Sequence, residues 1–73
     1  MSLKDRIRVK ELPYRGTFGV KFHAKIEGVV VAMTRTRDDA MTHALERLQA
    51  AGVTAETPTW EIANMLKKHE EAP

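Results

Sequence analysis

An alternation of apolar and polar residues over positions 18–26 constrains this chain more than any other feature of its sequence. Every second residue in this stretch is apolar, and Lys21, His23 and Lys25 lie between the apolar positions. A period of two places the apolar residues on one face of a β-strand. Glu27-Gly28 follows as a tight turn, because glycine accepts the positive φ that reversing the chain requires. We therefore predict a β-hairpin with one apolar face and one basic face.

The short turn also predicts how the two strands of the hairpin pair. A two-residue turn places six apolar residues on the inner face in opposed pairs: Ile26 with Val29, Ala24 with Val31, and Phe22 with Met33. Phe18 shares this register and is assigned to the core. Three residues of the second strand fall on the basic face: Val30, Ala32 and Thr34.

Further elements are predicted on both sides of the hairpin. Residues 6–12 alternate weakly before Pro13, so the sheet has three antiparallel strands, at about 6–12, 17–27 and 29–35. Thr36 is placed to cap a helix over residues 37–51, whose apolar stripe covers the inner face of the sheet until Gly52 ends it.

A second helix is predicted over residues 58–69, because Pro58 fits the first turn of a helix. Its inner face is assigned to Ile62, Ala63 and Leu66. The expected fold class is therefore α+β, a single small βββαα domain over residues 1–73.

The composition is that of a small soluble protein of the cytoplasm. The chain has 73 residues and no cysteine, so disulfides and thiolate metal sites are excluded, which suits a reducing compartment. The longest uncharged apolar stretch, residues 28–34, is too short to cross a bilayer. Residues 1–10 are too charged for a signal peptide.

No motif of the common enzyme classes is present in the sequence. His23, His43 and His69 fall on three separate elements without the spacing of a metal site, so we expect neither a metal nor another cofactor. Asp38 and Asp39 resemble an acid pair, but their place in the first turn of a helix explains them. We expect a protein that is not an enzyme and has no small-molecule substrate.

The distribution of charge is more informative than the net charge of +2. Residues 1–37 carry nine basic and three acidic residues, whereas residues 38–73 carry three basic and seven acidic ones. A basic sheet surface suits a polyanion, and a sheet can present side chains to the major groove. We therefore predict nucleic-acid binding, with duplex DNA as the expected partner. The candidate contacts are Arg6, Arg8, Lys10, Arg15, Lys21, His23, Lys25, Arg35 and Arg37.

The pattern of residues 6–51 resembles the arm-type DNA-binding domain of phage integrases and its relative, the AP2 domain. The resemblance rests on three short strands with a basic outer face, on the segment Gly19-Val20-Lys21-Phe22-His23-Ala24-Lys25-Ile26, and on Thr36-Arg37-Asp38-Asp39-Ala40 at the helix start. In those families the sheet enters the major groove and the helix backs it. The second helix is extra and no recombinase domain follows, so the resemblance implies a stand-alone accessory or regulatory protein.

Alternatives to duplex DNA binding remain open at this point. Single-stranded nucleic acid or RNA is favoured if Tyr14 is exposed beside the basic residues. A non-catalytic assembly or adaptor protein is the main alternative, acting as a homodimer or larger oligomer through a strand edge or through Trp60. Trp60 is otherwise interpreted as packing across the helix junction. Small antitoxins of the HicB kind are similar in their strand, strand, helix order, although their usual acidic, glycine-containing strand segment is missing here.

Overall fold

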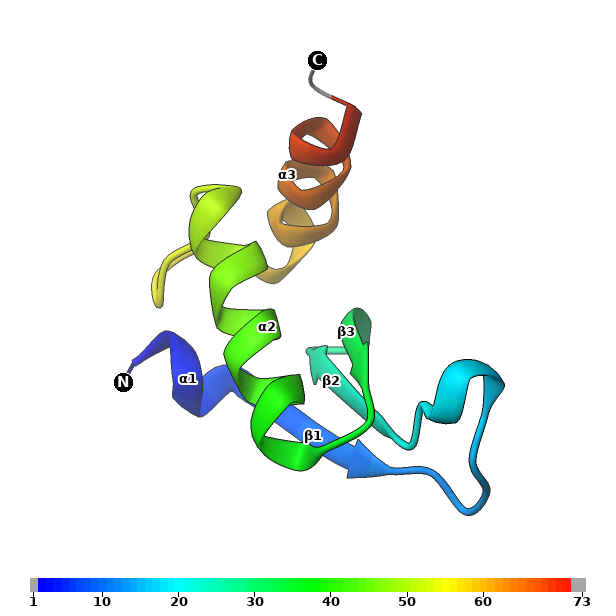
Figure 1. Ribbon diagram of the computed structural model, residues 1–73. Helices are drawn as coiled ribbons and strands as arrows, with labels where there is room; N and C mark the ends of the chain where they lie inside the picture. Colours follow the sequence, from blue (N-terminus) through cyan, green and yellow to red (C-terminus); the bar gives the residue numbers. More distant parts are fainter. Residues whose placement is uncertain (1, 72–73) are drawn as a thin grey trace.

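A computed structural model describes residues 2–71 of the protein and has an α+β fold, as the sequence predicts (Figure 1). Its elements, in chain order, are α1 (Leu3–Arg6), β1 (Ile7–Glu11), the 3-10 turn η1 (Thr17–Gly19), β2 (Phe22–Ile26), β3 (Val29–Thr34), α2 (Arg37–Ala50) and α3 (Thr59–Glu71). None of the helices in this range has the length and apolar composition needed to cross a lipid bilayer.

The three strands form one antiparallel sheet in the order β1-β2-β3, and α2 lies across one of its faces (Figure 1). The face under α2 is called the inner face below, and the opposite one the outer face. Thr36 caps α2 as predicted, because its Oγ1 accepts a hydrogen bond from the Asp39 amide at 3.2 Å. Gly52, with φ of 86°, follows the end of the helix.

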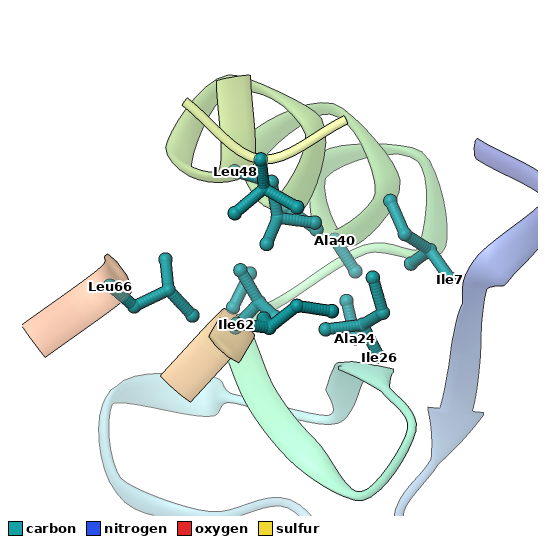
Figure 2. Packing of buried hydrophobic residues seen from close by; sticks show 11 residues of the cluster. Ile7, Ala24, Ile26, Ala40, Leu48, Ile62 and Leu66 are labelled. Carbon is teal, nitrogen blue, oxygen red and sulfur yellow. The ribbon is translucent and has the colours of Figure 1, made fainter. Parts of the chain in front are cut away.

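The hydrophobic core lies where the sheet, α2 and α3 converge (Figure 2). Ala24 of β2 and two alanines of α2, Ala40 and Ala44, are fully buried, and such small side chains let a helix approach a sheet closely. The largest fully buried side chains are Ile26, Val31, Leu48 and Ile62. The core therefore joins all three strands to both long helices.

A β-bulge in β3 overturns part of the predicted pairing. Ile26 pairs with Val29 as expected, but the register shifts between Ala24 and Lys25, so Ala24 pairs with Ala32. The two consecutive residues Val31 and Ala32 are both buried, and Met33 is 61% exposed. The predictions that Met33 faces inward and Ala32 outward are therefore wrong, because a bulge inserts one residue and reverses the side-chain parity beyond it.

The predicted start of β2 at residue 17 is also wrong. Thr17–Gly19 forms a 3-10 turn in which Phe18 has φ of 60° and Gly19 has φ of 78°, and regular strand begins at Phe22. Phe18 is 82% exposed, so its assignment to the core is wrong as well. Glycines at 16 and 19 flank Phe18 and favour a turn over the strand that the alternation predicts.

The inner face of α3 is predicted correctly at two of three positions. Ile62 and Leu66 are buried, whereas Ala63 is exposed and Met65 packs against the core instead. Trp60 is 74% exposed, so the interpretation that it packs across the helix junction is wrong. The helix itself begins and ends one or two residues later than predicted.

A hydrogen-bonded ion pair between Arg6 and Glu27 connects distant parts of the chain. The Arg6 Nη2 atom lies 2.7 Å from Glu27 Oε2, and Arg6 Nη1 donates to the carbonyl oxygen of Thr57 at 2.7 Å. Thr59 Oγ1 donates to the same carboxylate. The Arg6 side chain is only 9% exposed, so this predicted nucleic-acid contact instead ties the β2–β3 turn to the segment that precedes α3.

These contacts make part of the stability of the fold dependent on pH. The hydrogen bond from the Thr59 hydroxyl, followed by those from Arg6, lowers the pKa of Glu27 below its ordinary value. A lowered pKa in the folded state gives stability that is present above the unfolded-state pKa and is lost as pH falls through the folded-state pKa.

We therefore predict that Glu27→Gln makes the stability of the fold less dependent on pH. Between about pH 5 and pH 3, the melting temperature of the wild type should fall more than that of the variant. Glu46→Gln on the exposed side of α2 is the matched control and should follow the wild type. If the melting temperatures of the wild type and Glu27→Gln fall equally across this pH range, the prediction is contradicted.

Candidate nucleic-acid interface

The outer face of the sheet is built from two rows of side chains that run across the three strands. One row is Arg8, Lys25 and Val30, and the other is Lys10, His23 and Met33. Residues that are directly opposite in an antiparallel sheet point to the same face. The register therefore brings together four of the predicted contact residues: Arg8, Lys10, His23 and Lys25.

Basic side chains lie directly opposite one another in this arrangement, and Arg8 and Lys25 form a like-charge pair. Arg8 is paired with Lys25 across β1 and β2, and Lys10 is paired with His23. Opposed side chains in such pairs have Cβ atoms about 4.5–5.5 Å apart, and like charges there destabilise a sheet. An anion bound over the two pairs would offset this repulsion.

The same face is also apolar toward one end. Met33 is 61% exposed, and the loop between β1 and β2 adds Tyr14 at 69% and Phe18 at 82%. A groove of about 510 Å³ lies among these side chains, lined by Leu12, Tyr14, Phe18, Val20, His23 and Met33. His23 belongs both to the groove and to a basic row, so the apolar and basic parts are continuous.

Backbone hydrogen bonds and two arginines fix the shape of the loop that carries Tyr14 and Phe18. The Gly16 amide donates to the Val20 carbonyl at 2.7 Å, and the Leu12 amide donates to the Lys21 carbonyl at 2.7 Å. Arg35 Nε donates to the Phe18 carbonyl at 2.6 Å. Arg15 Nη1 approaches the Gly19 carbonyl at 3.5 Å. Two predicted contact residues, Arg15 and Arg35, therefore lie beside the groove and support its loop.

The other predicted contacts lie away from these rows. Lys21 Nζ is 3.6 Å from a carboxylate oxygen of Glu11. Arg37 begins α2, where its Nη1 lies 3.4 Å from the Val9 carbonyl and its guanidinium carbon lies 5.3 Å from the centre of the Phe22 ring. Arg6 is engaged by Glu27, as described above. Six of the nine predicted contact residues thus lie on the outer face or beside its adjoining loop.

Sequence reasoning missed two residues of this surface. Met33 reaches the outer face only because of the bulge in β3, for which the run of apolar residues from Val29 to Met33 gives no signal. The alternation predicts Phe18 in the core, although the flanking glycines 16 and 19 indicate a turn. Both residues add apolar surface to a face that was predicted from its charges alone.

Within residues 2–71, no group of three or more His, Cys, Asp or Glu side chains is placed to hold a metal ion. Comparisons with protein-family models, with curated proteins and with solved structures find no match to this chain.

The backbone at Phe18 predicts a gain in stability on substitution by glycine. A bulky residue at a φ of 60° is strained, whereas glycine adopts this conformation readily. Because the Phe18 side chain is mostly exposed, Phe18→Gly should raise the free energy of unfolding by up to about 1 kcal/mol.

Urea denaturation of the two proteins measures this difference. Val30→Gly is the control, because Val30 is also exposed but lies in regular strand, where glycine should destabilise by about 0.5–1 kcal/mol. A destabilisation at position 18 as large as that at position 30 would show that the Phe18 side chain contributes to folding.

Proposed function

We propose that this protein is a small accessory or regulatory protein that binds nucleic acid through the outer face of its sheet. The observation that carries the proposal is the direct opposition of Arg8 to Lys25 and of Lys10 to His23. Opposed cations such as Arg8 and Lys25 are unfavourable in a sheet, and a bound polyanion would offset this cost. Nucleic acid is a polyanion with closely spaced phosphates, and lysine and arginine are its usual phosphate contacts.

The surroundings of the two rows support the same proposal. Arg15 and Arg35 lie at the groove end of the outer face, and no acidic residue occupies either row. Two acidic residues of the strands and their turn have basic or hydroxyl partners: Glu11 lies near Lys21, and Glu27 is bound by Arg6 and Thr59. The two rows therefore contain basic side chains and no carboxylate of their own.

Both duplex and single-stranded nucleic acids present phosphates to such a face. A sheet can enter the major groove of duplex DNA, which is the partner that the sequence favours. The exposure of Tyr14 beside the basic residues is the feature that favours unpaired strands. The two forms are therefore compared in the same experiment.

We expect steep salt dependence when binding to a labelled oligonucleotide is measured by fluorescence anisotropy across a salt series. Each lysine or arginine that contacts a phosphate of duplex DNA contributes about −0.9 to the slope of log K against log salt concentration. Arg8→Gln/Lys25→Gln should therefore weaken binding at low salt and make this slope shallower by about 2.

The matched control is Lys67→Gln on the exposed side of α3, which leaves the outer face intact. It should bind as the wild type does. Binding of neither duplex nor single-stranded oligonucleotides at low salt, or equal losses in the Arg8→Gln/Lys25→Gln and Lys67→Gln variants, would refute the proposal.

A partner contact at Trp60 is a second candidate function, favoured by the 74% exposure of this side chain. Exposed tryptophan is enriched at the energetic centres of protein interfaces. Assembly through the strand edges is less favoured, because α2 supplies donors to both edge strands: Arg37 to the Val9 carbonyl and Arg47 to the Val31 carbonyl.

Sedimentation equilibrium tests this second function. If Trp60 forms a self-association contact, the protein should be an oligomer that Trp60→Ala converts to monomer without lowering the melting temperature. If the wild type is a monomer, self-association through Trp60 is excluded.

A further inference from the structure

The groove beside the basic rows combines two features that do not help the protein to fold. Tyr14 and Phe18 expose large aromatic side chains to water, and Phe18 does so from a backbone with φ of 60°. Strained backbone persists where the surrounding structure enforces it, and such residues cluster at binding sites. Here Arg35 and the Gly16–Val20 hydrogen bond enforce it.

The loop is also accessible to a large ligand. It extends away from the helical layer formed by α2 and α3 (Figure 1). Tyr14 and Phe18 line the groove together with Met33, and His23 joins the groove to the basic rows. A ligand in the groove would therefore lie next to Lys10, which is directly opposite His23.

The side chains of the groove and of the basic rows indicate which kind of ligand can bind there. Aromatic side chains offer flat apolar surfaces on which a nucleobase can stack, and stacking accepts any base. The adjacent cations require that the same ligand carry negative charge. An unpaired nucleotide in a single strand meets both requirements, whereas a paired base in a duplex has its faces covered by its neighbours.

A second copy of the chain meets these requirements poorly. A two-fold dimer through the outer face would bring Arg8, Lys10 and Lys25 against the same surface patch of the other copy. Juxtaposed like charges oppose association. Charge complementarity therefore favours a polyanion over self-association at this surface.

We propose that the groove between Tyr14, Phe18 and Met33 binds an unpaired base of a single-stranded nucleic acid while the two basic rows hold its phosphates. This inference rests on the proposed function, because it names the form of nucleic acid that the outer face takes. It gives the protein a preference for single strands over duplexes of the same length.

The test compares three fluorescein-labelled probes of about 12 nucleotides by anisotropy: an oligodeoxythymidylate, the corresponding oligouridylate, and a mixed-sequence DNA duplex. The wild type should bind at least one single strand more tightly than the duplex. A fourth probe, a single strand of abasic sites, retains the phosphates but has no bases to stack.

Two substitutions remove the aromatic surfaces. Tyr14→Ala deletes one of them. Phe18→Gly deletes the other, and glycine readily adopts the positive φ of this position. Each should weaken single-strand binding by about 5- to 150-fold, which is the range expected for loss of one stacked base. Each should leave binding to the duplex and to the abasic strand within about twofold of the wild type.

Trp60→Ala is the matched control, because Trp60 is an exposed aromatic side chain of α3 that belongs neither to the groove nor to the basic rows. Tyr14→Phe is the conservative variant and should retain single-strand binding. Melting curves of every variant establish that the fold is retained.

The outcomes separate this inference from the function on which it rests. If single strands and duplex bind equally, and Tyr14→Ala and Phe18→Gly change neither, the groove does not take a base although the outer face binds phosphates. If no probe binds at low salt, both proposals fail. If sedimentation shows a dimer that Phe18→Gly dissociates, the groove is a self-association surface and the inference is overturned.

Discussion

The ion pair between Arg6 and Glu27 connects the start of the sheet, the β2–β3 turn and the segment that precedes α3. Arg6 ends α1, Glu27 lies in the turn between β2 and β3, and Thr59 begins α3. One carboxylate thus receives hydrogen bonds from two segments that are distant in sequence, and the same arginine donates to carbonyl oxygens at Thr54, Ala55 and Thr57. In a chain of 73 residues with no disulfide, these contacts hold the helical layer in place over a small core.

This ion pair also determines which charges reach the outer face. It engages Glu27, the acidic residue of the hairpin turn, together with Arg6, while Lys21 approaches Glu11. What is left on the sheet is a compact group of cations, Arg8, Lys10 and Lys25, with His23 among them. The basic character of the outer face is therefore partly a result of which acidic residues form ion pairs outside the two rows.

The elements with strong local signals could be predicted from the sequence. Thr36 followed by two aspartates gives the start of α2, and Glu27-Gly28 gives the hairpin turn, because capping and positive φ depend on a few neighbouring residues. The placement of basic residues of β1 and β2 on one face follows from alternation and from antiparallel pairing, whereas their direct opposition depends on the register that the structure shows. The cationic part of the candidate site was therefore accessible to sequence reasoning.

The apolar part of the candidate site was not accessible in the same way. Its exposure depends on the conformation of Phe18, which is enforced by Arg35 from 17 residues away, and on the bulge in β3. The run Val29 to Met33 is apolar throughout, so the hydrophobic pattern is satisfied whether Met33 or Ala32 faces the core. Packing against Ala24 and α2 selects Ala32. Trp60 and Ala63 were misplaced for a related reason, since the docking angle of α3 is set by tertiary contacts with Ile62 and Leu66.

The bulge has a consequence for how β3 tolerates mutation during evolution. Between the turn and the bulge, Val29 faces the core and Val30 lies on the outer face. Beyond the bulge, the even-numbered Ala32 faces the core and the odd-numbered Met33 lies on the outer face. Val31 is the extra residue of the bulge, so loss of its codon would leave Ala32 inside and Met33 outside in a regular strand. Such a deletion would still remove a fully buried side chain from the core, so the bulge adds apolar volume to the core without changing which residues face outward.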